Sequence, residues 1–258
     1  MPISTERCYD EIEASSETLA GLVDGADLTA PVPTCPDWTL RQLATHVGRA
    51  HRWSAEIVST RSAEFIPFRQ VPDGRFPDDP AQHAPWLRAG AARVIGAVRE
   101  AGDDPVWVFG RLRPATFWAR RMAHETTVHR ADAEIAAGRE AGFEPDIAAD
   151  AIDEWLGFMS GLGGDGDGDP RAGALPDGAV LHVHATDEGL DGAGEWLVRR
   201  EGPQVIVQPG HGQGDVALRG PAGRLLLVLL RRVPPDDPQV QVLGDPALLA
   251  GWLAATPF

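Results

Sequence analysis

Apolar residues recur along the first part of the chain at the spacing of helices. Before residue 163 they fall mostly three or four positions apart, the pattern of helices that bury one face. Gly25, Gly102 and Gly138 supply stop signals, and Asp37 is placed to cap the second helix. The pattern predicts five helices, at about residues 5–24, 43–57, 84–101, 114–138 and 147–159.

The spacing shortens to a period of two in the last third of the chain. Segments of alternating apolar and polar residues are separated there by Gly, Pro and Asp, which is typical of short strands. We expect strands at 180–186, 195–200, 204–208, 215–220 and 240–244, with helices at 222–232 and 245–255. These elements predict a small α+β domain.

A segment rich in glycine and aspartate, residues 163–173, separates the two patterns and is expected to be a linker. We therefore predict a helical domain over residues 1–162, built as a four-helix bundle with the fifth helix bracing it, and an α+β domain over 174–258. Three alternating aspartates in the linker resemble the start of a calcium-binding loop. Pro170 and Pro176 occupy the places of the required glycine and glutamate, which argues against calcium.

Composition narrows the classes of partner. The 258 residues fit two domains of ordinary size, and the formal net charge of -15 disfavours nucleic acids and anionic membrane surfaces. Small molecules are the expected partners. All 23 basic residues are arginine, which indicates a GC-rich genome because lysine codons are AT-rich.

Cysteine usage and the N-terminal sequence bear on location. Cys8 and Cys35 are too few for a disulfide framework, and the first residues lack the basic and apolar regions of a signal peptide. No stretch of about 18 apolar residues could span a bilayer. A cytoplasmic location is expected.

Polar residues interrupt the apolar stripes of two predicted helices. Glu125 and His129 lie on the stripe that Trp118 and Met122 begin, and His46 lies on the inward stripe of the second helix. Two histidines and a carboxylate are the ligands of a catalytic zinc site with one open position. The alternative is a hydrogen-bonded Glu–His pair within an ordinary core.

The other histidines and the cysteines carry weaker signals. We expect His51 and His124 to be exposed, and His83 to lie in a loop. His182 and His184 share one strand face, which indicates the solvated side of a half-covered sheet more than a second metal site. Cys35 precedes the second helix and is expected to serve in packing.

Three segments, in this order, resemble the mycothiol-dependent maleylpyruvate isomerase family: "CPDWTLRQLATHVGRAHRW", "HETTVHRADAE" and "LLLVLLRRVPPDDPQVQVLGDPALLAGW". The resemblance implies a DinB-like helical bundle whose metal ligands, for zinc above other divalent metals, are His46, Glu125 and His129. It also implies a sterol-carrier-like α/β domain that supplies a functional arginine from a Gly-Arg dipeptide. That dipeptide reads Arg231-Arg232 here, and Arg232 aligns with the arginine.

The function implied by the resemblance is activation of a thiol. Zinc would hold mycothiol as a thiolate for addition or transfer to a small electrophile, as in an isomerase or an S-transferase. Mycothiol is the small thiol of actinobacteria, and the lysine-free composition fits such a genome. Two alternatives remain: a hydrolase that uses zinc-bound water, and a non-catalytic helical module.

Overall fold

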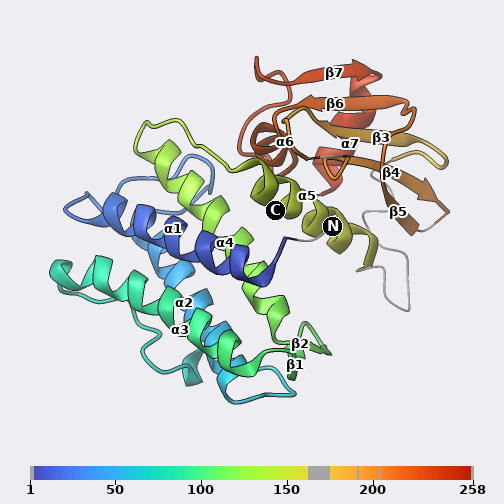
Figure 1. Cartoon of the computed structure of the whole chain (residues 1–258). Coiled ribbons are helices and arrows are strands. Elements are labelled where there is room, and N and C mark those ends of the chain that lie inside the picture. Colours follow the sequence, from blue (N-terminus) through green and yellow to red (C-terminus); the bar gives the residue numbers. More distant parts are fainter. Residues whose placement is uncertain (1–2, 162–174, 191, 203, 257–258) are drawn as a thin grey trace. The chain divides into compact units, whose positions relative to one another are not determined.

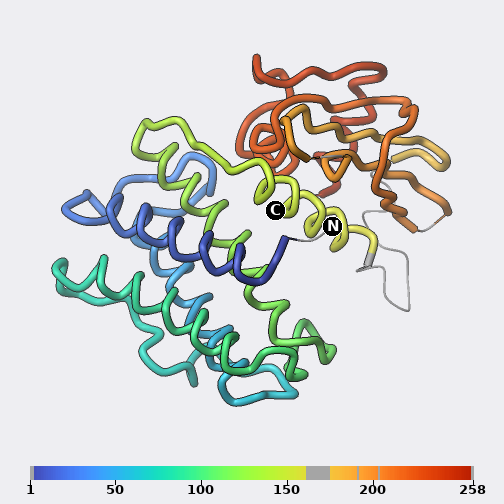
Figure 2. Tube along the Cα trace, in the orientation of Figure 1, coloured from blue at the N-terminus to red at the C-terminus, as the bar shows by residue number. Residues whose placement is uncertain are grey.

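The computed structural model describes residues 3–161, 175–190, 192–202 and 204–256 of the chain, which is drawn as a cartoon in Figure 1 and as a tube in Figure 2. The chain divides into two compact units, Ile3–Ala141 and a unit that begins at Gly142. Each unit is described by itself.

Four long helices form the N-terminal unit: α1 (Thr5–Val23), α2 (Leu40–Ser59), α3 (His83–Ala101) and α4 (Thr116–Ala136). Helix α1 packs along α3 and α4, and α2 packs along α3 and α4 as well. Short 3-10 turns at Phe68–Gln70 and Pro80–Gln82 lie in the α2–α3 connection. The predicted bundle is confirmed.

Local capping explains where these helices begin and end. Thr39 caps α2 through a capping box, in which Gln42 donates its backbone N–H to the threonine hydroxyl and accepts from the Thr39 backbone. The expected cap, Asp37, instead lies in the preceding turn with a φ of 70°. Gly102 and Gly138 follow α3 and α4 at positive φ, as the stop signals predict.

A hairpin that the sequence did not predict joins α3 to α4. Strands β1 (Pro105–Val108) and β2 (Arg111–Pro114) pair antiparallel, and Phe109 and Gly110 form the turn with φ values of 46° and 84°. Two consecutive positive φ values fit the tight turn that matches strand twist. Its first residue is usually Asn or Asp, so the Phe-Gly pair gave no signal.

The C-terminal unit is a five-stranded sheet with helices. Its strands are β3 (Val180–Ala185), β4 (Glu195–Glu201), β5 (Gln204–Pro209), β6 (Val216–Gly220) and β7 (Gln241–Gly244), and its helices are α5 (Pro145–Gly161), α6 (Ala222–Leu229) and α7 (Pro246–Ala255). The strand order is β5-β4-β3-β6-β7, and only the β3–β6 pair among these is parallel. The predicted α+β arrangement is confirmed.

One face of this sheet is buried and the other is partly open. Leu181, Val183, Val198 and Leu218 are fully buried, and α6 packs against β3 and β6. Alternate residues of the same strands point to the opposite face, because side chains alternate along a strand.

Helix α5 packs with the sheet unit. It contacts α6 and β5, and the Trp196 indole N–H donates to Asp153 at 3.2 Å. The units therefore divide near Gly142, ahead of the expected boundary at 163. The sequence placed the boundary too late because α5 still has the helical spacing of the first unit. The helix nevertheless belongs to the second unit, with Ile152 and Leu156 buried. The expected linker, 163–173, lies outside the described residues.

The end of α6 keeps the backbone of a glycine cap without a glycine. Arg231 has a φ of 58°, its N–H donates to the Val228 carbonyl at 2.9 Å, and the Arg232 N–H donates to Leu227 at 2.7 Å. These bonds close the helix in the left-handed turn that glycine usually provides. In the described part of the chain, no helix has the length and apolar character needed to cross a membrane.

Candidate metal centre

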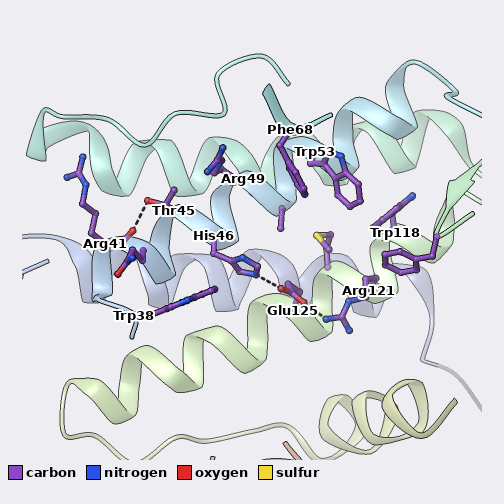
Figure 3. A pocket seen from close by; sticks show the side chains of 14 residues that line it. Trp38, Arg41, Thr45, His46, Arg49, Trp53, Phe68, Trp118, Arg121 and Glu125 are labelled. Atoms are coloured by element: carbon purple, nitrogen blue, oxygen red, sulfur yellow. Dashed lines mark hydrogen bonds and ion pairs between the residues drawn. The ribbon is translucent and has the colours of Figure 1, made fainter. Parts of the chain in front are cut away.

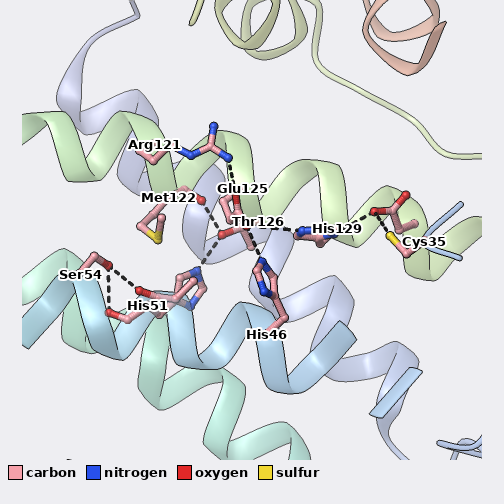
Figure 4. Close-up of polar contacts among 11 residues, drawn as sticks. Cys35, His46, His51, Ser54, Arg121, Met122, Glu125, Thr126 and His129 are labelled. Atoms are coloured by element: carbon pink, nitrogen blue, oxygen red, sulfur yellow. Dashed lines mark hydrogen bonds and ion pairs between the residues drawn. The ribbon is translucent and has the colours of Figure 1, made fainter. Parts of the chain in front are cut away.

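Helices α2 and α4 bring the three predicted ligands together (Figure 4). His46 Nε2 lies 2.6 Å from Glu125 Oε1, and His129 Nε2 lies 3.4 Å from the same oxygen. One ligand atom from each of the three residues lies within 4.8 Å of the others. The i,i+4 spacing places Glu125 and His129 on one face of α4, and α2 presents His46 to that face.

These donors fit a divalent transition metal. Ligand atoms bound at about 2.1 Å to a tetrahedral zinc ion lie roughly 3.4 Å apart. The His129–Glu125 contact already has this length, and the His46–Glu125 contact would need to open. Two imidazoles and a carboxylate occupy three positions and leave the fourth for a reactant. The direct His46–Glu125 hydrogen bond also fits a core pair, but the arrival of a third donor at the same oxygen favours a ligand set.

Further side chains hold two of the three candidate ligands, His129 and Glu125, in place. Asp132 accepts from His129 Nδ1 at 2.8 Å, which leaves Nε2 directed toward Glu125. Arg121 pairs with Glu125 Oε2, leaving Oε1 for the histidines. Partners of this kind fix the ring orientation and raise the basicity of metal ligands.

Electrostatics at the site favour a cation between the donors. Burial would raise the pKa of Glu125, but Arg121 and the two imidazoles hold that pKa well below its usual value. Burial would lower the pKa of His129, but Asp132, Cys35 and Glu125 hold it well above its usual value. Because Asp132 occupies Nδ1, the carboxylates stabilise positive charge at Nε2, whether a proton or a metal ion carries it.

The ligand cluster opens into a pocket of about 700 Å³ within the bundle (Figure 3). His46 and Glu125 line it, as do three arginines, Arg41, Arg49 and Arg121. An aromatic wall completes it, with Trp38, Trp53, Phe68, Phe109 and Trp118. Among the residues that the structure describes, the lining of this pocket contains no cysteine or serine.

Aromatic packing shapes both ends of this pocket. The Trp38 ring lies 5.0 Å from the His46 ring and 5.9 Å from the His129 ring, between centroids. At the other end, Trp53 packs edge-on to Trp118 at 5.2 Å, and Phe109 from the hairpin lies 5.6 Å from Trp118. The unpredicted hairpin therefore supplies part of the wall.

Several minor expectations were wrong. His51 and His124 are buried, with 0% and 2% of their surface exposed, and His83 is buried at the start of α3. Helix α4 is covered on most sides, so a residue off the main stripe is still enclosed. Cys35 does more than pack, because its Sγ lies 3.2 Å from Asp132 Oδ2 beside His129.

Sequence reasoning missed three residues of the site. Asp132 and Arg121 lie three or four positions from a ligand on α4, and that spacing was the available signal. Arg49 lines the pocket from α2, three residues after His46. Nothing in its sequence context separates it from a solvent-facing arginine.

Comparisons with known proteins agree with this architecture. Residues 9–134 match the mycothiol maleylpyruvate isomerase N-terminal domain, and residues 146–251 match the MDMPI C-terminal domain. The fold and the matched domains thus define a two-domain protein whose helical N-terminal half carries the candidate metal centre. The chain belongs to the mycothiol-dependent maleylpyruvate isomerase family.

Solved structures support the fold. The mycothiol-dependent maleylpyruvate isomerase and a histidine-to-alanine mutant of it each superpose with a TM-score of 0.61 at 15% identity, over 93% of this chain and 93% of theirs. At that identity the likeness establishes the fold alone. No curated protein was similar enough in sequence to count as a relative.

Replacing His46 tests the metal centre. We expect His46→Ala to lose most of the bound zinc, because two remaining ligands cannot hold the ion tightly. Elemental analysis and zinc titration of the full-length protein measure this. Thr45→Ala is the control, since Thr45 lines the same pocket and donates only to the Arg41 carbonyl in the described structure. Full zinc occupancy in His46→Ala would reject the ligand assignment.

His51 predicts a pH dependence of stability. Its Nε2 lies 2.7 Å from the Thr126 hydroxyl, and burial together with Arg52 lowers its pKa to about 3. The unfolded chain binds a proton near pH 6.5 while the folded one stays neutral, so stability is full above pH 6.5 and falls as pH decreases toward 3.

The slope belonging to His51 can be isolated by substitution. In metal-free protein, the free energy of unfolding of the wild type should fall relative to His51→Gln by roughly 1.4 kcal/mol per pH unit below 6.5. Urea unfolding at a series of pH values measures the difference, in which other titrating groups cancel. Parallel pH profiles for the two proteins would show that His51 is not held neutral.

Proposed function

We propose that this protein is a zinc-dependent enzyme that uses mycothiol to isomerise a small cis-unsaturated acid of the maleylpyruvate type. The observation that carries the proposal is the convergence of His46, Glu125 and His129 on a pocket lined by arginines. Family membership supports the thiol and the reaction class. A thiol transfer to another electrophile would use the same centre.

A zinc ion, when bound, would supply the positive charge that keeps a thiol deprotonated at neutral pH. The side chains of the protein do the rest of the positioning. Arg121 and Asp132 orient Glu125 and His129, and Trp38 packs against both imidazoles. The described pocket lining holds no cysteine or serine, which supports a nucleophile supplied by the thiol.

The chemistry balances without an oxidant or reductant. Addition of the thiol sulfur and a proton across the double bond leaves a single bond that can rotate. Loss of the thiol sulfur and one proton, which together re-form the thiol, restores the alkene in the trans form. The thiol is regenerated, so it is required but not consumed.

Arginines of the pocket suit an anionic substrate. Arg41 pairs with Asp78 at 3.3 Å, and Arg121 is held by Glu125. Arg49 lines the pocket, is exposed, and forms no ion pair with any residue that the structure describes. A guanidinium in that position can bind a carboxylate with two parallel hydrogen bonds.

Arg232 is proposed as a second anion-binding residue of the enzyme. It follows the left-handed Arg231, is half-buried, and donates from Nη1 to the Leu230 carbonyl at 3.0 Å. The backbone turn that presents it is the one in which the family resemblance implies a glycine. The shape of this turn supports giving Arg232 the role that the resemblance implies, although Arg231 stands where a glycine is expected.

A turnover assay tests the proposed function. We expect maleylpyruvate to be isomerised only when both zinc and mycothiol are present, with the metal-free protein as the control. Hydrolytic cleavage of the substrate with zinc but without thiol would indicate a hydrolase that uses water as its nucleophile. If the zinc-loaded protein turned over none of a panel of cis-enedioic acids and thiol acceptors in the presence of mycothiol, the proposed function would be wrong.

Arginine variants in the same assay test substrate binding. Arg49→Ala should raise KM by about 10- to 100-fold, because one charge-assisted contact is lost. Arg232→Ala should lower turnover while zinc content and thiol affinity stay unchanged, and lysine should rescue it only partly. Arg69→Ala is a matched exposed control near the pocket rim. If Arg49→Ala or Arg232→Ala had the same kinetics as the wild type, that arginine would not have the proposed role.

A further inference from the structure

A second cluster of potential metal ligands lies in the C-terminal unit. His182 and His184 come from β3, Glu195 from β4, and His211 from the connection between β5 and β6. One ligand atom from each residue lies within 4.8 Å of all the others. The cluster belongs to a different unit from the bundle site and shares no residue with it.

Strand geometry places the first three residues on one face. His182 and His184 are two apart and so point the same way, and Glu195 pairs directly with His184 in the antiparallel register. Glu195 Oε2 lies 2.9 Å from His182 Nε2 and 3.6 Å from His184 Nδ1. The sequence predicted a solvated face here, but His182 is buried and His184 is only half-buried.

The fourth residue reaches the cluster through a glycine-rich loop, "PGHGQGD". A Cβ on Gly214 would lie 3.0 Å from the Cβ of His182, and one on Gly212 would lie 2.6 Å from a Leu197 methyl group. Only residues without a side chain let the loop approach the strand so closely. The loop leaves His182 only 6% exposed and carries His211 Nδ1 to 2.7 Å from Glu195 Oε2.

We propose that these four residues bind a second divalent metal ion, zinc in the first instance. Three imidazoles and one carboxylate complete a tetrahedral zinc shell and leave no open position, which is the arrangement of a structural site. Ligand atoms in such a shell lie roughly 3.4 Å apart, so the two shortest contacts to Glu195 would open by well under 1 Å.

Glu195 supplies the negative charge of this cluster. Arg219 on β6 is a neighbouring cation, paired in register with His184, and its Nη1 donates to Gln241 Oε1 at 3.3 Å. The ion would fasten the β5–β6 connection to β3 and β4. Its role is therefore to hold the loop and sheet together, and it takes no part in the proposed isomerisation.

The experiment counts metal in full-length protein with and without the bundle site. His184→Ala and His211→Ala should each remove about one equivalent of zinc, both in the wild type and in the His46→Ala background. Gln213→Ala, an exposed position in the same loop, should remove none. Each sheet variant is compared with its own parent, the wild type or His46→Ala. The difference in zinc content therefore reports on the sheet site whether or not the bundle site holds zinc.

Hydrogen exchange gives a second, local measurement. Adding zinc to chelator-treated protein should slow exchange of the backbone amides at 210–215 in the wild type and in His46→Ala, but not in His211→Ala. Unchanged zinc stoichiometry in both sheet variants would overturn the proposal. An exchange rate at residues 210–215 that does not change when zinc is added would overturn it as well. The cluster would then be a hydrogen-bonded network around Glu195 alone.

Discussion

The carboxylate of Glu125 lies inside a helical bundle, where an ionised group is costly unless charged or hydrogen-bonding partners surround it. Arg121 from the same helix engages one oxygen, and His46 and His129 approach the other. This requirement ties α2 to α4 at one level of the bundle. It also explains why the apolar stripes of both helices are interrupted at the same height, since neither interruption would be stable without the other.

Around that carboxylate the site has two sides with different roles. The Asp132 side is closed: Asp132 is fully buried and holds His129, with Cys35 beside it. The His46 side opens to the pocket, and 39% of that side chain is exposed. A metal held between the two sides would be rigid toward the core and accessible toward a reactant, which is the division that a catalytic centre needs.

Periodicity predicted most of the fold, because long amphipathic helices and alternating strands leave a clear pattern in sequence. It identified His46, Glu125 and His129 through polar residues on apolar stripes. It could not assign α5 to the sheet unit, since a helical period does not say what a helix packs against. The Phe109-Gly110 turn lacked the usual residues, and His211 joins its cluster only through the path of a loop.

Arg231 shows what kind of constraint acts at the end of α6. The turn there keeps a φ of 58° and two closing hydrogen bonds although the side chain is arginine. The fold thus requires a positive φ at this position, but it does not require a glycine there. A search for relatives that demands the Gly-Arg dipeptide would pass over chains like this one, whereas a search on backbone geometry would retain them.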